Sequence, residues 1–220
     1  AGVPVVLHGM QHIEGRLSAW QALQAAGVRR AVSVQSASVV LKSEGIVYMD
    51  VAEICPPLFA LLKLRPRLGV RSFAHTVARL LNPLGCAGQL NGVFHTPYVS
   101  LMAQANARLD QPRSLIFMGA EGEAELYASR QKLMTAQMHH ETVALSYADA
   151  ACDLYPRQIE RDAAFLLDGF TGLCSGQMDG REAVVLERMQ QAFAFASTGV
   201  IPQDWTDTVQ GEQDIKGETI

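Results

Sequence analysis

Four short segments of this sequence combine side chains that could bind an anion or a metal ion. The first, residues 8–18, has two glycines and two histidines and contains His8, Gly9, Arg16 and Ser18. It precedes a predicted helix, whose free backbone N–H groups and positive dipole end favour phosphate. Arg16 could add two parallel hydrogen bonds to such an anion. An ordinary strand-to-helix loop is the alternative interpretation.

The second segment is a long stretch without acidic side chains. Between Ile54 and Leu109 there is no Asp or Glu, against six basic residues: Lys63, Arg65, Arg67, Arg71, Arg79 and Arg108. A proline and a glycine interrupt the stretch, so several guanidinium groups could point at one anion. Such a block attracts phosphorylated metabolites or a nucleic-acid backbone. A solvated helix face, neutralised by the acidic C-terminal half, is the alternative.

The other two segments contain carboxylates and histidines. Residues 119–125 follow a predicted strand and include three glutamates, and clustered carboxylates at strand ends are typical of magnesium sites in phosphate chemistry. Three solvated surface glutamates are the alternative interpretation. His139 and His140 stand together in a polar turn, where we expect both to face solvent.

Strands and helices alternate along the chain and must position these segments. We expect strands near residues 4–8, 46–50, 90–94 and 114–118. We expect helices at 18–26, 33–43 and 72–81, from Pro97 onward, and later at 159–170 and 185–196. A weaker antiparallel pair is expected at 134–138 and 142–145. This order predicts an α/β fold with a mostly parallel sheet, helices on both faces and a ligand beyond the strand ends.

Composition excludes several classes of protein. No apolar run approaches the ~18 residues that a bilayer crossing needs, and no secretory signal is visible, so we expect a cytoplasmic protein without membrane contact. The four cysteines have neither metal-ligand nor redox spacing. Residues 203–220 are polar and acidic and are predicted to form a disordered tail after a single domain, 1–202. Because the chain opens on a core strand without Met, we expect an N-terminal portion to be missing.

The first 130 residues resemble glycosyltransferase family 3, which includes anthranilate phosphoribosyltransferase. The similar segments keep both order and spacing: 4–9, 25–28, 56–57, 68–71, 75–83, 92–97 and 117–125. The YbiB-type paralogues are the most similar, because their Ala-His-Thr run matches residues 74–76 where the biosynthetic enzyme has Phe-Asn. The resemblance implies the α/β C-terminal domain of that family, which is nucleoside phosphorylase-like. A helical domain and a first phosphate loop would precede Ala1, and we expect residues 57–81 to expose an apolar surface toward that helical domain.

The resemblance also implies a set of ligand-binding residues. The biosynthetic enzyme condenses anthranilate with phosphoribosyl diphosphate, through an oxocarbenium-like state stabilised by magnesium and anion clamps. Its substrate-side arginine falls on Arg65 and the arginine of its Gly-x-Arg-Thr element on Arg71. The implied residues for phosphate or substrate are His8, Gly9, Arg16, Ser18, Arg65, Arg71 and His75.

Other elements of the family pattern are altered in this sequence. The family's Lys-His-Gly-Asn-Arg element is similar to residues 7–11, where the Asn and Arg are not retained. The serine-rich diphosphate loop is reduced to Arg16 and Ser18. The magnesium pair Asp-Glu falls on Ala124 and Glu125, so one ligand is lost and only Glu125 remains for Mg²⁺.

These matches lead to alternative functions. The protein could bind a phosphoribosyl or other phosphate ligand and carry out altered or weak pentosyl transfer. It could instead be a non-catalytic, YbiB-type protein that binds single-stranded nucleic acid through Lys63, Arg65, Arg67, Arg71 and Arg79. A third alternative is a folded remnant whose arginines make only internal ion pairs. We expect a homodimer, which could align two basic faces into one groove.

Overall fold

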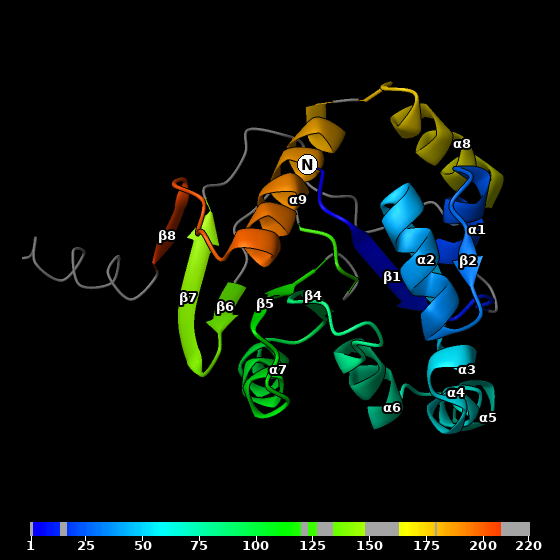
Figure 1. Ribbon diagram of the computed structural model, residues 1–220, viewed down its shortest axis with the longest axis horizontal. Helices are drawn as coiled ribbons and strands as arrows, with labels where there is room; N and C mark the ends of the chain where they lie inside the picture. Colours follow the sequence, from blue (N-terminus) through cyan, green and yellow to red (C-terminus); the bar gives the residue numbers. More distant parts are fainter. Residues whose placement is uncertain are drawn as a thin grey trace, which may run out of the picture. The chain divides into compact units, whose positions relative to one another are not determined.

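A computed structural model describes residues 2–13, 17–119, 123–126, 134–147, 163–178 and 180–207 (Figure 1). The chain divides into two compact units. The first unit contains Gly2–Gly85 and Arg157–Met178, and the second contains Cys86–Pro156 and Asp179–Ile220.

The first unit contains a parallel three-stranded sheet in the order β1-β3-β2. Its strands and the helices that connect them are β1 (Val5–Gly9), α1 (Ala19–Ala25), β2 (Arg30–Ala31), α2 (Val34–Glu44) and β3 (Ile46–Asp50). Ser33 caps α2 through the Ser36 N–H, and Gly45 ends that helix with a φ of 77°. β1 and β3 are in register from Val5 opposite Ile46 to Gly9 opposite Asp50, so their carboxyl ends meet at the same edge.

A series of short helices follows β3 in this unit. They are α3 (Val51–Ile54), α4 (Pro56–Leu62), α5 (Arg65–Leu68), α6 (Phe73–Val77) and the 3-10 turn η1 (Ala78–Leu80). Prolines at the first turns of α4 and α5 and the left-handed Gly69 explain why no long helix forms here. The helix α8 (Ala163–Cys174) packs against α1.

The short helices leave many apolar side chains at the surface. Their inner faces bury Val51, Leu58, Leu62 and Ala74. These helices and their connections expose six large apolar side chains, with Phe73 at 70% and Val70 at 64%: Leu61, Leu64, Leu68, Val70, Phe73 and Val77. The apolar surface expected at residues 57–81 is therefore exposed, while its contact with a helical domain stays a prediction.

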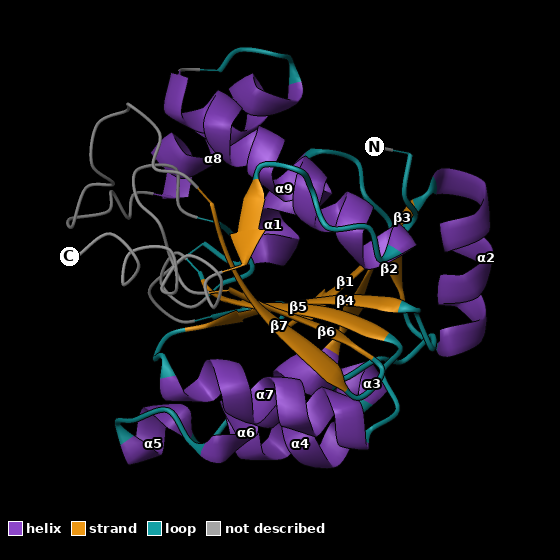
Figure 2. Cartoon of the chain, turned by 90° about the vertical axis from the view of Figure 1, so that its left-hand side faces the viewer, coloured by secondary structure: helices purple, strands orange, loops and turns teal. Residues whose placement is uncertain are grey.

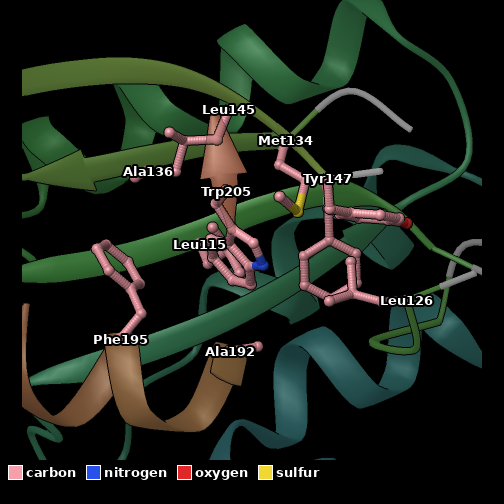
Figure 3. Packing of buried hydrophobic residues seen from close by; sticks show 10 residues of the cluster. Leu115, Leu126, Met134, Ala136, Leu145, Tyr147, Ala192, Phe195 and Trp205 are labelled. Carbon is pink, nitrogen blue, oxygen red and sulfur yellow. The ribbon is translucent and has the colours of Figure 1, made fainter. Parts of the chain in front are cut away.

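The second unit is built on a five-stranded sheet in the order β4-β5-β6-β7-β8. Its elements are β4 (Gly88–Val93), α7 (Pro97–Arg108), β5 (Arg113–Met118), β6 (Met134–Met138), β7 (Glu141–Tyr147), α9 (Gly180–Thr198) and β8 (Trp205–Asp207). β4 and β5 are parallel, and the remaining neighbours are antiparallel. Figure 2 shows α7 on one face of this sheet and α9 on the other. The core between the sheet and α9 includes Leu115, Phe195 and Trp205 (Figure 3).

The α/β class and all four expected strands are confirmed, as is the antiparallel pair around His139 and His140. The strands are distributed over two hydrogen-bonded sheets, and only the first is parallel throughout. Two strands were not expected, β2 and β8, because two or three residues carry no periodic signal. β8 lies within the predicted tail 203–220, so the prediction of disorder is wrong for Trp205–Asp207. Residues 208–220 lie outside the described residues, so the domain boundary stays a prediction.

None of the helices in the described part of the chain combines the length and the hydropathy needed to cross a membrane.

Glycines at the carboxyl ends of β4 and β5 allow a loop to approach the sheet closely. A Cβ atom at Gly92 or Gly119 would overlap the carbonyl oxygen of Glu123. The backbone of residues 123–125 is therefore packed directly on the two strand ends.

We predict that Gly92→Ala lowers the free energy of unfolding by about 1–3 kcal/mol or more, because the new methyl group meets backbone that cannot rotate away. Urea denaturation measures this loss. Gly180→Ala is the matched control, since nothing lies within 4 Å of a Cβ atom at the start of α9. Equal stability of the two variants would contradict the close packing.

Candidate functional site

A buried carboxylate organises the carboxyl ends of β1 and β3. Asp50, the last residue of β3, is 3% exposed. Its Oδ1 accepts a hydrogen bond from the Ala52 N–H at 2.7 Å and so caps α3. Its Oδ2 accepts from the Gln11 N–H, also at 2.7 Å. One side chain thus joins the loop after β1 to the helix after β3.

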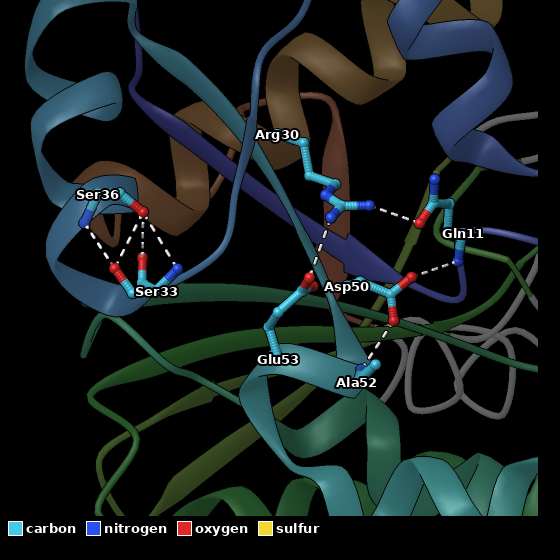
Figure 4. Close-up of polar contacts among 7 residues, drawn as sticks. All are labelled: Gln11, Arg30, Ser33, Ser36, Asp50, Ala52 and Glu53. Atoms are coloured by element: carbon cyan, nitrogen blue, oxygen red, sulfur yellow. Dashed lines mark hydrogen bonds and ion pairs between the residues drawn. The ribbon is translucent and has the colours of Figure 1, made fainter.

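Arg30 and Ser18 also bond to this loop, and Figure 4 shows the contacts of Arg30. The Arg30 guanidinium donates through Nη1 to Gln11 Oε1 at 2.5 Å and through Nη2 to Glu53 Oε1 at 3.1 Å. Ser18 Oγ donates to the Gln11 carbonyl at 2.7 Å. Gln11 therefore makes three hydrogen bonds within the first unit, through its backbone N–H, its carbonyl and its side-chain oxygen.

Tyr48 lies in β3, two residues before Asp50, and is buried. Its ring stacks on Trp20 with 5.0 Å between the ring centroids. Its hydroxyl lies close to Gly9, since a Cβ atom added to that glycine would be 3.6 Å from the hydroxyl oxygen. Burial raises the pKa of Tyr48 well above its ordinary value of 10, and the nearby charge of Asp50 adds to this effect. Among the described residues, neither the Tyr48 hydroxyl nor Glu53 Oε2 has a hydrogen-bond partner.

Four of the predicted ligand residues belong to the β1–α1 segment. Burial lowers the pKa of His8, while a hydrogen bond with the Leu81 backbone opposes that effect. Gly9 ends β1 opposite Asp50. Ser18 is buried, and its hydroxyl is used within the protein: it donates to Gln11 and accepts from the Gln21 N–H at 3.3 Å. Arg16 lies outside the described residues.

Three cations of the basic block act on the pKa of His75. The Ser72 N–H donates to His75 Nδ1 at 3.2 Å, which completes a capping box at the start of α6. Burial lowers the pKa of His75 below its ordinary 6.5, and three positive charges lower it further: Arg65, Arg71 and Arg79. A hydrogen bond with the Ser72 backbone, whose carbonyl oxygen lies 3.3 Å from Nδ1, raises the pKa of His75. The three positive charges thus act on the same imidazole ring.

The remaining nucleic-acid candidates, Lys63 and Arg67, are not among the charges that act on the pKa of His75. The ammonium group of Lys63 lies over the Phe59 ring, 5.8 Å from its centroid. Arg67 is exposed in α5, as is Arg65. Within the described residues, no carboxylate lies within ion-pair distance of Arg65, Arg67 or Arg71. The alternative of arginines engaged in internal ion pairs has no support at these three positions.

Glu125 is the predicted metal ligand, and it lies at the carboxyl ends of β4 and β5. It is half-buried, Glu123 is exposed, and Ala124 between them offers no ligand atom. No three potential ligands among His, Cys, Asp and Glu come together in the described part of the chain. Glu121 lies outside the described residues. We therefore derive no step through a metal ion.

Sequence reasoning missed Gln11, Arg30, Asp50 and Glu53 as a connected set. Asp50 could have been noticed, because an acidic residue directly follows the apolar run Ile46–Met49 at a strand end, where α/β proteins bind ligands. Arg30 gave no such signal, since its strand is only two residues long. Its link to Gln11 and Glu53 spans 19 and 23 residues and depends on the sheet order.

Several known proteins are similar to this chain. YbiB of Escherichia coli (strain K12), an uncharacterized protein, is 34% identical over 133 residues, which are 60% of this chain and 41% of YbiB. Anthranilate phosphoribosyltransferase of Erythrobacter litoralis is 32% identical over 126 residues, which are 57% of this chain and 38% of that enzyme. The chain thus spans about two fifths of the length of these relatives.

Solved structures share the fold at lower identity. Anthranilate phosphoribosyltransferase (TrpD) of Thermus thermophilus has a TM-score of 0.63 and 20% identity, covering 90% of this chain and 60% of the enzyme. The Saccharomyces cerevisiae enzyme, in complex with PRPP and Mg, has a TM-score of 0.55 and 14% identity, covering 90% and 66%.

A model of the glycosyl transferase family, a/b domain (Glycos_transf_3), matches residues 1–160. This match covers most of the chain, and it agrees with the relatives in sequence and in fold. The chain therefore belongs to the glycosyl transferase family of anthranilate phosphoribosyltransferase-like proteins.

Proposed function

We propose that this chain binds a phosphorylated small molecule similar to phosphoribosyl diphosphate, and that any pentosyl transfer it supports is altered or weak. The observation that carries the proposal is that the charges of Arg65, Arg71 and Arg79 all act on His75, while Arg65 and Arg71 are exposed. A related enzyme, that of Saccharomyces cerevisiae, has been solved in complex with PRPP and Mg.

The chemistry of these side chains suits a diphosphate. Two exposed arginines without a carboxylate in the described structure can each offer two parallel N–H donors to phosphate oxygens. Nδ1 of His75 is engaged locally, since it lies 3.2 Å from the Ser72 N–H and 3.3 Å from the Ser72 carbonyl oxygen, so the proposal assigns the ligand contact to Nε2. Anion binding would also relieve the repulsion between the three positive charges.

The proposal of altered or weak catalysis rests on residues of the family pattern that this sequence replaces. Ala124 replaces one of the two carboxylates that the family resemblance implies for magnesium, and Met10 and Gln11 replace its Asn and Arg. Loss of a single transition-state charge contact typically costs ~10²–10³ in rate. We therefore expect little or no turnover with anthranilate as the acceptor.

Nucleic-acid binding is a second candidate, because Lys63, Arg65, Arg67 and Arg71 are all exposed along consecutive short helices. A phosphate backbone would use such a row of cations, whereas a small ligand would use only those that act on His75. A homodimer would double the row, and the dimer is part of this proposal.

We predict that Arg65→Ala and Arg71→Ala each weaken pyrophosphate binding about tenfold, the expected loss for one charge-assisted contact. Isothermal titration calorimetry measures the affinity. Arg29→Ala is the matched control, because it removes one positive charge from the same unit at a residue paired with Glu44. Wild-type protein that does not bind pyrophosphate or phosphoribosyl diphosphate would refute the small-molecule proposal.

The same variants separate the two candidates when single-stranded DNA replaces pyrophosphate. For a nucleic-acid binder, each lost phosphate contact reduces the slope of log K against log salt by about 0.7, and Arg67→Ala has the same effect as Arg71→Ala. For a small-molecule site, Arg67→Ala leaves pyrophosphate affinity unchanged.

We predict that sulfate binds more tightly as the pH falls below about 6.5, because sulfate keeps its charge while His75 gains one. The pKa of His75 in the ligand-free protein lies below 6.5, so at neutral pH the ring is uncharged and its extra attraction for an anion is absent. Titrations between pH 5 and 8 measure the trend. The His75→Gln variant should lose this pH dependence of sulfate affinity. If the variant keeps the wild-type pH profile, a group other than His75 causes the trend.

We predict that magnesium binds no more tightly than the millimolar range, even with phosphoribosyl diphosphate present, since Ala124 supplies no oxygen. Calorimetry with MgCl₂ tests this, and Ala124→Asp should increase the affinity. Sub-millimolar binding by the wild type would contradict it.

A further inference from the structure

Three aromatic rings are exposed together where the chain passes from β4 into α7. Phe94 and His95 follow the last residue of β4, and Tyr98 is the second residue of α7. Phe94 is 54% exposed and Tyr98 39%. The ring centroid of His95 lies 4.8 Å from that of Phe94 and 6.4 Å from that of Tyr98. The three rings therefore form one aromatic patch on the surface of the second unit.

The backbone holds this aromatic patch in place. Val93 and Val99, the residues that flank it, are each 1% exposed, so the chain is anchored in the core on both sides. Between them, the Tyr98 N–H donates to the His95 carbonyl at 3.0 Å. The Val99 N–H donates to the Thr96 carbonyl, also at 3.0 Å. A ligand thus meets rings that are already positioned, and little conformational entropy is lost when it binds.

The size of the aromatic patch distinguishes between kinds of partner. A fully covered aromatic side chain contributes ~150–250 Å², so three partly exposed rings offer on the order of 300 Å². A stable protein–protein interface needs roughly 800 Å² on each partner. The patch is too small for such an interface, even with Leu101, which is exposed one turn later in α7. It matches the faces of one or two planar rings.

The openness and the charge of this segment favour a nucleic-acid strand over a free small molecule. Residues 94–98 are all exposed, so the patch covers one face of a ring, whereas small-molecule sites enclose ~70–90% of their ligand. No Asp or Glu occurs in β4, in α7 or in the connection between them, so this segment does not repel phosphates. Bases in a duplex already stack on both faces, so only an unpaired base has a free face for this patch.

We propose that Phe94, His95 and Tyr98 form a stacking site for the unpaired bases of a single-stranded nucleic acid. Every base has a π-face, so stacking of this kind tolerates any base sequence. The Tyr98 hydroxyl and the His95 ring nitrogens can add hydrogen bonds to base edges. This site goes beyond the second candidate function, which uses only phosphate contacts, and it requires neither the arginines nor His75.

Two strands of equal charge test the proposal: a thymidine oligonucleotide and an abasic strand of the same length. Both offer the same number of phosphates, so a difference in affinity reports contacts to the bases. Phe94→Leu and Tyr98→Leu each remove a ring and keep an apolar side chain. Leu109→Ala is the matched control, because it removes a side chain that is 62% exposed at the opposite end of α7. Fluorescence anisotropy across a salt series measures the affinities.

We expect the wild type to bind the thymidine strand about tenfold more tightly than the abasic strand. Phe94→Leu and Tyr98→Leu should each lower the affinity for the thymidine strand about fivefold and leave the affinity for the abasic strand unchanged. Neither variant should change the slope of log K against log salt, since no phosphate contact is lost. Leu109→Ala should match the wild type in every measurement. Tyr98→Leu serves if Phe94→Leu does not fold.

Equal wild-type affinity for the two strands would overturn the stacking site and leave nucleic-acid binding through phosphates intact. An unchanged preference for the thymidine strand in both Phe94→Leu and Tyr98→Leu would also overturn it. Thymidine monophosphate that binds as tightly as the strand would overturn the strand as the occupant. If the wild type binds neither strand, the stacking site and the second candidate function are both refuted, while the pyrophosphate titration still decides the first.

Discussion

Burial of a carboxylate is tolerated only where hydrogen bonds replace its lost hydration, and Asp50 meets that condition with two backbone N–H groups. Those two groups belong to the two chain segments that leave the carboxyl edge of the parallel sheet. The geometry of that edge in the first unit therefore depends on one ionised side chain. The same network extends to Arg30, Glu53 and Ser18. Its second carboxylate, that of Glu53, is less buried than Asp50.

The network also explains why some sequence predictions succeeded and others did not. Helix starts at Ser18 and Ser33 and the helix end at Gly45 were predictable, because capping chemistry depends on neighbours within about three residues. The Arg30 contacts depend instead on the order β1-β3-β2, which no local pattern specifies. Periodicity likewise located β3 and β5 but could not locate β2, whose two residues are too few to alternate.

The candidate ligand residues divide in the same way. Family resemblance selected Arg65, Arg71 and His75, and in the structure the charges of the two arginines lower the pKa of His75. It also selected Ser18, whose hydroxyl is committed to Gln11 and Gln21. Resemblance identifies aligned positions, whereas the hydrogen-bonding capacity of a side chain is decided by its partners in three dimensions. For that reason Ser18 supports the loop in this structure as a cap.

The three residues of β8 have a consequence for how the second sheet ends. β7 is a seven-residue strand with Val143, Leu145 and Tyr147, a composition that readily pairs with other strands. β8 covers its free edge with a short strand that places Trp205 in the core and ends at Asp207. Short, charged edge strands are a common protection against intermolecular sheet growth. A chain ending at Pro202 would leave the hydrogen-bonding groups of β7 open, and intermolecular strand pairing would become a route to aggregation.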